Sequence, residues 1–543
     1  MTTRTGLFFA LLAVLSLLAI GRDAEAQDVL TWHNDNARTG QNLDERLLTL
    51  QNVNSKTFGK LFTIQVDGKV DAQPLYVANL RIANERLRNV LFVATEHDSL
   101  YAFDADSGKQ FWHTQLLKTG ETPSDNVSCG QITPEIGVTS TPVIDRRMGP
   151  HGTIYVVAMS KDSQGHYLQR LYGLDLTNGK EEFGGPEEIR ATFPGSGAAS
   201  TNGTATFDPK QYAERAALLL ANGVIYTTWT SHCDHNPYNG WIIGYDARTL
   251  KQTTVLDITP NGEEGAIWQS GAGPAADAEG NIYLLSANGT FDTTLNPQGF
   301  PSQGDFGNSF LKLSMRDRRL SVADYFTPFN VVAENAVDQD LGSGSAVVLP
   351  DMRDASGKTR HLVVGAAKDL NIYLLNRDAM GKFNPEEGNH NIYQQVYKAL
   401  KGVRYRGQPV YFDGRLYCSS VGDFLYAFKF VDARLVEQPV SHTPKKFVYP
   451  GASPSVSANG LKNAIVWAVE NGDGEQVGPA VLHAYDANDL ANELYNSDQA
   501  PGLRDRFGDG NKFITPMIAH GKVYVGTTNG VGVLGLLPNS TSP

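Results

Sequence analysis

Short apolar segments recur in pairs along the chain, and this pattern limits the possible folds more than any other feature. In each pair a β-branched or aromatic segment is followed, after a gap, by a second segment that often ends in Asp and a turn. The clearest pairs are 90–95 with 99–104, 153–158 with 170–175, and 224–229 with 241–246. Less regular pairs are 281–285 with 309–313, 361–365 with 371–375, 415–418 with 424–428, 464–467 with 481–486, and 522–525 with 531–534. The sequence therefore predicts about eight repeated β-units.

Each unit also has a strand before the pair, with Pro near its start in 73–77, 140–144, 408–411 and 515–518. The last unit lacks an outer strand after Leu534, whereas a spare strand at 59–66 precedes the first unit. We therefore predict an all-β fold, an eight-bladed β-propeller of four-stranded antiparallel blades whose ring is closed by this N-terminal strand. A solenoid is the alternative, but it would need capping repeats that the sequence does not contain.

The N-terminus predicts export. Arg4 precedes an apolar run over 7–20, and Ala24-Glu25-Ala26 has the small residues of a cleavage site, which together predict a signal peptide. An uncleaved membrane anchor is the alternative. The predicted organisation is a signal peptide 1–26, an N-terminal leader 27–56, a single propeller 57–538 and a tail 539–543. We expect a periplasmic or secreted protein with no membrane span after cleavage.

Charge and motifs exclude several functional classes. The net charge of −12 and the lack of any long Lys/Arg cluster argue against nucleic-acid binding, which requires a basic surface. The sequence contains no G-x-S-x-G, Walker or dinucleotide-binding motif, which disfavours a serine hydrolase, an ATPase and a Rossmann domain. The expected partners are a small molecule, a sugar or a cell-envelope protein.

Three cysteines occur, Cys129, Cys233 and Cys418, without any C-x-x-C spacing that would encode a zinc ribbon or bound haem. Because export leads to an oxidising compartment, we predict a disulfide between Cys129 and Cys233, which flank two predicted loops, and a buried thiol at Cys418. The run from His232 to His235 also permits a zinc site, although consecutive residues do not easily converge on one tetrahedral ion.

Residues 102–112, Ala-Phe-Asp-Ala-Asp-Ser-Gly-Lys-Gln-Phe-Trp, resemble the tryptophan-docking motif of quinoprotein alcohol dehydrogenases, and 174–183 is a weaker copy. Other segments are similar to this family in order and rough spacing, namely 38–42, 50–54, 265–270, 287–290, 304–305 and 368–377. The chain thus resembles the pyrroloquinoline-quinone-type β-propellers. This resemblance implies two cofactors, pyrroloquinoline quinone and calcium.

The resemblance also implies roles for individual residues. Trp268 would stack on the quinone, Lys368 would contact its oxygens, and Asp71 would be a carboxylate close to it. The implied calcium ligands are Asn288, Asp305 and Asp234, and Asp305 would also be the catalytic base that takes a proton from the substrate.

The sequence keeps the pattern of the family fold but lacks several features that accompany the family's activity. The pair of adjacent cysteines that covers the quinone in many members is missing, and no haem segment is present. These departures favour a binding or scaffold module with a degenerate quinone-type axial site. The alternative is a periplasmic dehydrogenase that oxidises an alcohol or a sugar with pyrroloquinoline quinone and calcium. Fold alone does not decide between them, because propellers have many functions.

Overall fold

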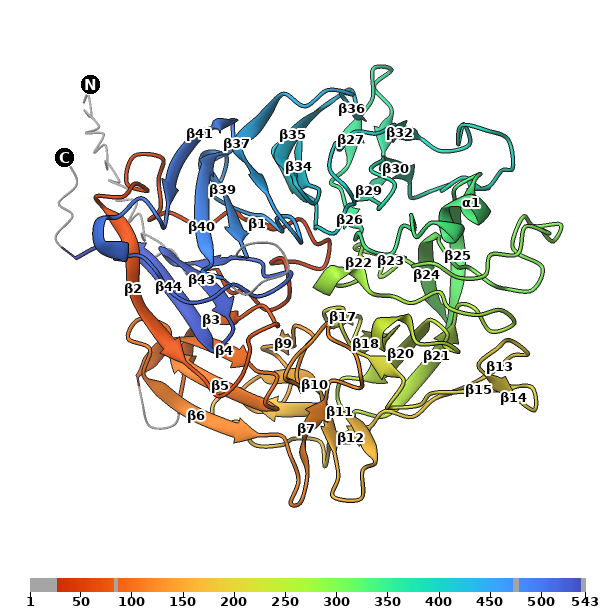
Figure 1. Ribbon diagram of the computed structural model, residues 1–543, viewed down its shortest axis with the longest axis horizontal. Coiled ribbons are helices and arrows are strands. Elements are labelled where there is room, and N and C mark those ends of the chain that lie inside the picture. Colours follow the sequence, from red (N-terminus) through yellow and green to blue (C-terminus); the bar gives the residue numbers. More distant parts are fainter. Residues whose placement is uncertain (1–26, 83–85, 472–477, 539–543) are drawn as a thin grey trace, which may run out of the picture.

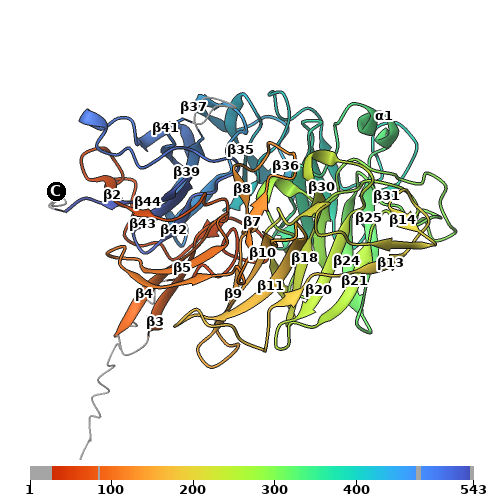
Figure 2. The same cartoon turned by 60° about the horizontal axis from the view of Figure 1, so that its bottom comes forward.

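A computed structural model describes residues 27–82, 86–471 and 478–538. The signal peptide (1–26) and the tail (539–543) predicted from the sequence lie outside these residues. The described residues are predominantly β, and their sheets lie side by side around a common centre (Figure 1). Turned by 60°, the strands run between the two faces of a thick disc (Figure 2).

The main sheets are built on four antiparallel strands that neighbour one another in chain order. The first contains β3 (Leu75–Arg81), β4 (Leu87–Ala94), β5 (Ser99–Asp104) and β6 (Gln110–Gln115). The next contains β9 (Val143–Asp145), β10 (Thr153–Lys161), β11 (Tyr167–Asp175) and β12 (Glu187–Glu188). Then follow β17 (Leu219–Ala221), β18 (Val224–Thr228), β20 (Trp241–Asp246) and β21 (Gln252–Asp257). The next sheet has β22 (Ala275–Ala276), β23 (Ile282–Leu285), β24 (Phe310–Arg316) and β25 (Arg319–Thr327).

The second half of the chain repeats this order. Its sheets contain β26 (Val347–Val348), β29 (Leu362–Ala366), β30 (Ile372–Asn376) and β32 (Gln394–Val396), then β33 (Val410–Phe412), β34 (Arg415–Ser419), β35 (Asp423–Val431) and β37 (Ser441–Phe447). Next come β38 (Ser455–Asn459), β39 (Lys462–Glu470), β40 (Val481–Asp486) and β41 (Asp489–Asn496). The last sheet combines β42 (Met517–Ala519), β43 (Lys522–Thr527) and β44 (Gly530–Leu536) with β2 (Phe58–Gln65) from the other end of the chain.

The pairing of β2 with β44 is antiparallel and joins Ile64 to Val531 and Phe58 to Leu536. It is the strand pairing that the sequence predicted. In Figure 1 the first strands β9, β17, β22 and β26 lie toward the centre, whereas β2, β6 and β41 lie at the periphery.

Shorter elements decorate these sheets. The additional strands are β1 (Gln41–Asn42), β7 (Thr122–Asp125), β8 (Glu135–Ile136), β13 (Thr192–Pro194), β14 (Ser200–Thr201), β15 (Thr204–Thr206), β16 (Tyr212–Ala213), β19 (Thr230–Ser231), β27 (Met352–Arg353), β28 (Thr359–Arg360), β31 (Lys382–Phe383) and β36 (Arg434–Leu435). The helical elements are α1 (Val331–Ala336) and the 3-10 turns η1 (His232–Asp234), η2 (Gln269–Gly271) and η3 (Pro501–Leu503). Within the described part of the chain, no helix is long and apolar enough to cross a membrane.

Burial differs between the inner and outer strands. Every residue of β5 and β23 is buried, because both faces of these strands are covered by neighbouring sheets. The outer strand β6 instead mixes exposed, half-buried and buried residues. The apolar core therefore lies between sheets, which explains why the inner strands appear in the sequence as continuous apolar runs.

The docking motif seen in the sequence joins two neighbouring sheets. Trp112 Nε1 donates a hydrogen bond to the backbone oxygen of Leu176 at 3.0 Å. A Cβ at Gly179 would lie 2.6 Å from the Trp112 ring, and the φ of Gly179 is +67°, so this turn requires glycine. The motif therefore fixes the contact between one sheet and the next.

The leader, residues 27–56, binds the first strand of every main sheet described above. It accepts backbone N–H donors from Tyr76, Ile144, Ala276, Val348, Tyr411 and Val456. The Asn36 and Asn42 amides donate to the backbone oxygens of Leu220 and Ile518. Arg38, which is fully buried, donates to the backbone oxygens of Pro274 and Leu218. The leader thus connects the first strands of all these sheets through hydrogen bonds.

Candidate functional site

Two adjoining pockets lie among the loops of the central region. The acidic pocket has a volume of about 550 Å³, counting space open to solvent, and its lining includes Asp234, Asn288, Asp338, Asp340 and Lys368. The aromatic pocket has about 520 Å³, and its lining includes Cys129, Arg215, His232, Tyr449, Lys512 and Phe513. Trp268 and Arg406 line both pockets, so the two meet at these side chains.

The sheets bring these residues together by a simple rule. Asn288 and Lys368 follow the second strands β23 and β29, and Asp234 follows β18 after the short strand β19. Trp268 precedes the first strand β22, and Asp338 precedes the first strand β26. Because first and second strands are antiparallel, the end of one and the beginning of the other lie on the same face. Loops from three successive sheets therefore converge.

Lys368 organises the acidic pocket. Its Nζ lies 2.6 Å from Asp338 Oδ1 and 2.6 Å from Asp340 Oδ2, and Arg404 binds the other oxygen of Asp338. Burial opposes ionisation of Asp338, but the hydrogen bond and charge of Lys368 outweigh it and lower the pKa of Asp338. Burial raises the pKa of Asp340 although Lys368 opposes this. The ammonium group thus balances two carboxylates.

Asn288 carries an unused hydrogen-bond acceptor at this position. Its Nδ2 donates to Asp338 Oδ1 at 2.8 Å, whereas its Oδ1 is buried and has no partner in the described structure. A buried acceptor without a partner is energetically costly, so such an atom suggests a missing ligand. Asp234 lies nearby at the rim of the pocket, where Tyr238 donates to its Oδ1 at 3.4 Å.

Trp268 lies between the two pockets. The Phe513 ring meets it edge-on at 5.2 Å, and the Arg406 guanidinium lies 5.8 Å from its ring centroid. The following residues Gln269 and Ser270 have φ values of 48° and 50°. Left-handed backbone is uncommon for such residues.

Asp305 and Asp71, which the resemblance placed beside the quinone, line neither of these two pockets. Asp305 is buried and its Oδ1 accepts a hydrogen bond from the Asn261 amide at 2.9 Å, so it stabilises a turn of the neighbouring sheet. Burial raises its pKa to about 6. Asp71 Oδ1 accepts from Arg215 Nη1 at 3.2 Å. Arg215 lines the aromatic pocket, and Asp71 contacts it without lining the pocket itself.

Asp338 and Asp340 occupy the position beside Asn288 and Lys368 that was assigned to Asp305. The resemblance pointed instead to the loop between β23 and β24, which contains Asp305, so Asp338 and Asp340 were not expected from the sequence. Their position in the sequence could have identified them. Asp338 and Asp340 precede the first strand of a sheet, as Trp268 and Asp71 do. The implied roles of Trp268, Asn288, Lys368 and Asp234 remain compatible with their place in one pocket.

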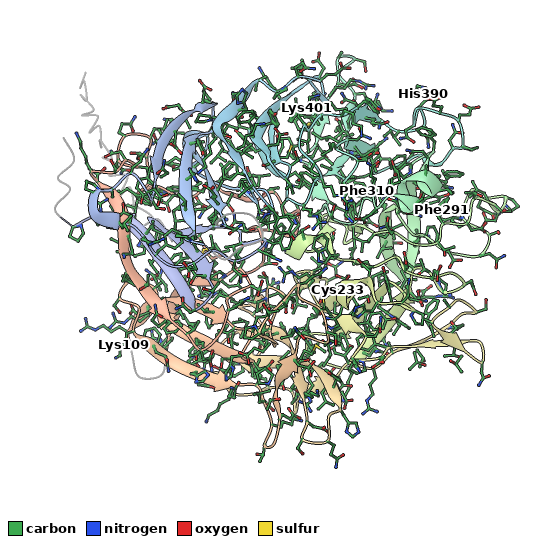
Figure 3. All side chains as sticks on the ribbon, viewed as in Figure 1. Lys109, Cys233, Phe291, Phe310, His390 and Lys401 are labelled. Carbon is green, nitrogen blue, oxygen red and sulfur yellow. A yellow bond between two sulfur atoms is a disulfide. The ribbon has the colours of Figure 1, made fainter. Side chains whose placement is uncertain are left out.

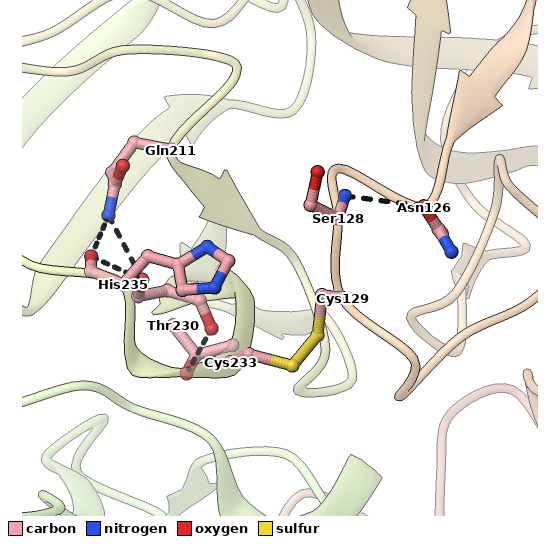
Figure 4. The surroundings of a disulfide bond; sticks show 8 residues. Asn126, Ser128, Cys129, Gln211, Thr230, Cys233 and His235 are labelled. Atoms are coloured by element: carbon pink, nitrogen blue, oxygen red, sulfur yellow. Dashed lines mark hydrogen bonds between the residues drawn. A yellow bond between two sulfur atoms is a disulfide. The ribbon is translucent and has the colours of Figure 1, made fainter.

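A disulfide joins Cys129 to Cys233, the pair expected from the sequence, and links the segment between β7 and β8 to η1 (Figure 4). Cys129 lines the aromatic pocket, and Figure 3 places Cys233 toward the middle of the molecule. Because the sulfur of Cys233 is bonded to Cys129, it is not a zinc ligand, which removes the zinc alternative based on residues 232–235. Cys418 is a buried free thiol.

No family model and no curated protein matches the sequence. Among solved structures, quinohemoprotein alcohol dehydrogenase ADHIIG from Pseudomonas putida HK5 aligns with a TM-score of 0.60 at 13% identity, over 95% of this chain and 81% of that chain. Quinohemoprotein alcohol dehydrogenase from Comamonas testosteroni aligns with a TM-score of 0.61 at 13% identity, over 94% and 80%. At this identity the likeness concerns the fold. The chain therefore has the β-propeller fold of the quinoprotein alcohol dehydrogenases.

Proposed function

We propose that this protein is a dehydrogenase that oxidises an alcohol with pyrroloquinoline quinone and a calcium-type cation. The observation that carries the proposal is the unpartnered Oδ1 of Asn288, which lies beside Asp338 and Lys368 in a pocket bordered by Trp268. The shared fold with quinohemoprotein alcohol dehydrogenases supports the same function. The combination of a free acceptor, balanced charges and an aromatic face favours a site for a quinone and a cation over a scaffold module.

The residues fit both groups chemically. Asn288 Oδ1 and the carboxylate of Asp234 are hard oxygen donors, the type that calcium prefers. The described chain contains no group of three or more His, Cys, Asp or Glu side chains arranged as a metal site, so an amide oxygen would have to complete the ligand set. Trp268 would stack on a flat quinone and Lys368 would bind its oxygens.

The side chains of the pocket have distinct roles in this proposal. When bound, the quinone accepts two electrons and two protons as the alcohol becomes a carbonyl compound. Asp338, whose side chain is 43% exposed, faces the pocket and would take the hydroxyl proton of the substrate as general base. Asp340 is completely buried and would hold Lys368 in position.

We further propose that the eight main sheets of the described residues are blades of one closed ring. A repeated contact supports this arrangement. The Tyr155 hydroxyl donates to Ala247 O, and the Tyr417 hydroxyl donates to Ala487 O, in each case from the second strand of one sheet to the turn of the next. Tyr524 in β43 makes the same contact with Ala105, which would make the first sheet the neighbour of the last. The pattern of residues 1–26 supports export to the periplasm or beyond.

The test of function uses the full chain with pyrroloquinoline quinone and Ca²⁺. We expect quenching of tryptophan fluorescence and reduction of an artificial electron-accepting dye in the presence of short alcohols. Asn288→Ala should raise the Ca²⁺ concentration needed for half-maximal quinone binding at least about tenfold, because it removes one cation ligand. Asn391→Ala is the matched control, since Asn391 Oδ1 is also buried without a partner in the described structure but lies outside both pockets.

Two results would contradict the proposal. One is the absence of both quenching and dye reduction at saturating quinone and Ca²⁺. The other is quinone binding that responds equally to the substitutions at Asn288 and Asn391. The binding-module hypothesis would then be the better account of the pocket.

A further inference from the structure

A third pocket, here called the outer pocket, lies away from the two central pockets. It has a volume of about 1670 Å³, counting space open to solvent, and it shares no lining residue with the acidic or the aromatic pocket. Its walls come mainly from α1, from the segment 387–397 that contains β32, and from β36 with the residues after it. His390 is one of its lining residues, and Figure 3 places it at the periphery of the molecule, whereas Cys233 lies toward the middle.

Amide side chains fix the walls of the outer pocket. Gln394 Nε2 donates to the backbone oxygen of Leu435 at 2.7 Å, and Gln394 Oε1 accepts from the backbone N–H of the same residue at 2.9 Å. Asn389, which is 4% exposed, accepts the backbone N–H of Phe329 at 2.9 Å and donates through Nδ2 to Gln395 Oε1 at 3.2 Å. These bonds join β32 to β36 and join the segment 387–397 to the residues before α1. The pocket therefore has its shape before a ligand arrives, which lowers the entropic cost of binding.

Tyr397 presents an uncovered aromatic ring in the outer pocket. It is 75% exposed, and within the described residues the only aromatic or cationic partner of its ring is Lys398, whose Nζ lies 5.9 Å from the ring centroid. Tyr393 in the same pocket is different, because the guanidinium groups of Arg434 and Arg360 lie 4.7 Å and 5.5 Å from its ring centroid. The outer pocket thus contains one aromatic face that the protein itself leaves open to a ligand.

The charges of the outer pocket do not favour a strongly charged ligand. Glu334 lines it and is 3% exposed, and burial raises the pKa of this carboxyl to about 8, so that it carries a proton at neutral pH. Glu387 and Glu437 are exposed carboxylates, and the guanidinium of Arg434 has the opposite charge. The lining therefore combines hydrogen-bond donors and acceptors with a small net charge.

This combination matches the chemistry of sugars. A sugar ring has an apolar face of C–H groups and an edge of hydroxyls, each of which donates and accepts hydrogen bonds. An open aromatic ring beside amides and carboxylates complements both features. We infer that the outer pocket binds a neutral saccharide, with one sugar ring stacked on Tyr397 and its hydroxyls bonded to Gln395 and to the exposed carboxylates Glu387 and Glu437. This site is separate from the proposed dehydrogenase centre and does not depend on it.

The experiment is an NMR titration of the full chain, without quinone or Ca²⁺, with three neutral disaccharides: cellobiose, maltose and lactose. We expect at least one of them to bind with a dissociation constant of about 1 mM or lower, and saturation transfer to be strongest at the C–H protons of one sugar face. Tyr397→Ala should weaken this binding at least about fivefold, whereas Tyr397→Phe keeps the ring and should stay within about twofold of wild type. Because Tyr397 is largely exposed, neither variant should change the urea midpoint of unfolding.

Two further variants show where the sugar binds. Tyr167→Ala is the matched control, because Tyr167 is a partly exposed tyrosine whose ring also lies near a lysine, 4.8 Å from Lys161 Nζ, but outside the outer pocket. Trp268→Ala changes the central pockets, where a sugar substrate would also bind. Both variants should bind the disaccharide as wild type does.

Three results would overturn the inference. The first is that none of the three disaccharides binds at about 10 mM. The second is that binding survives Tyr397→Ala, which would place the sugar elsewhere. The third is that a cationic disaccharide of glucosamine binds more tightly than the neutral ones and loses this advantage in salt, which would show a site that selects positive charge. Failure of the dye-reduction test would leave the titration unaffected, because the titration contains no quinone.

Discussion

His33 is a buried residue of the leader, and the folded structure favours the neutral form of its ring. Its ring stacks on Trp32 at 3.7 Å and its Nε2 lies 3.0 Å from Pro454 O. Burial, followed by the charge of Arg38, lowers the pKa of His33 to about 3, although the Pro454 hydrogen bond opposes this. In the unfolded chain the same imidazole binds a proton near pH 6.5. Between about pH 6.5 and 3 the unfolded chain therefore binds more protons than the folded chain.

From this we predict that His33 makes the protein sensitive to acid. Stability contributed by the neutral ring is present above about pH 6.5 and is lost by about 1.4 kcal/mol per pH unit as the pH falls toward 3. His33→Gln keeps a donor for Pro454 but does not titrate. The difference in unfolding free energy between wild type and His33→Gln, measured in urea at pH 7 and pH 4.5, should therefore shift in favour of the variant at the lower pH. A difference that does not change with pH would disprove this role.

At the level of single residues, the order of the motifs along the sequence anticipated which side chains lie close together, but only for some of them. Trp268, Asn288, Lys368 and Asp234 do line one pocket, because their order along the chain matches the order of successive sheets. Asp305 does not, since the excursion between β23 and β24 carries it to a turn of the neighbouring sheet. The depth to which a long loop folds back depends on tertiary contacts, and motif order does not contain that information.

The disulfide is the main covalent constraint between elements. Cys129 and Cys233 are 104 residues apart, so the bond closes a long loop between the β7–β8 segment and η1. In the chain-entropy model a loop of this length stabilises the folded state by up to about 4.7 kcal/mol, and native disulfides commonly contribute about 2–5 kcal/mol. It also fixes a wall of the aromatic pocket.

We therefore predict that the double variant Cys129→Ser, Cys233→Ser loses about 2–4 kcal/mol of unfolding free energy in urea. Reducing agent should lower the stability of wild type by a similar amount and leave the double variant unchanged, which serves as the control. In denaturant without reductant, thiol titration should find one reactive group per chain, Cys418. Three reactive groups would contradict the bond.

The strands of the main sheets were predictable, and the smaller elements were not. Paired apolar segments identified β4 with β5 and β10 with β11, because burial on both faces produces continuous apolar runs. The strands β13 to β15 and the helix α1 were missed. Their residues are mostly half-exposed or polar, so they carry no periodic pattern, and their conformation depends on the sheets against which they pack.

At the scale of the whole molecule, the strand β2 is the test of closure. Ile64 is 4% exposed and packs in the same apolar cluster as Val531 and Val533, whereas the neighbouring Thr63 is exposed. We predict that Ile64→Asp lowers the unfolding free energy by more than about 3 kcal/mol, because it buries an unpaired charge. Thr63→Asp, on the exposed side of the same strand, should change it by less than about 0.5 kcal/mol.

Cys418 reports whether this damage spreads. It is buried in β34, which belongs to a different sheet from β2. If the sheets form one closed ring, Ile64→Asp should speed the labelling of the Cys418 thiol, since loosening one sheet releases the rest. Labelling as slow as in wild type, despite the lost stability, would indicate that the last sheet opens alone.

The leader has a consequence for the order in which the chain folds. Its residues are synthesised before every strand that they bind, and Asn42 finds Ile518 across 476 positions. Until those strands exist, the hydrogen-bonding groups of the leader have only water as a partner, and contacts of such range form slowly. The leader therefore completes its hydrogen bonds only after the last inner strand that it binds has been synthesised.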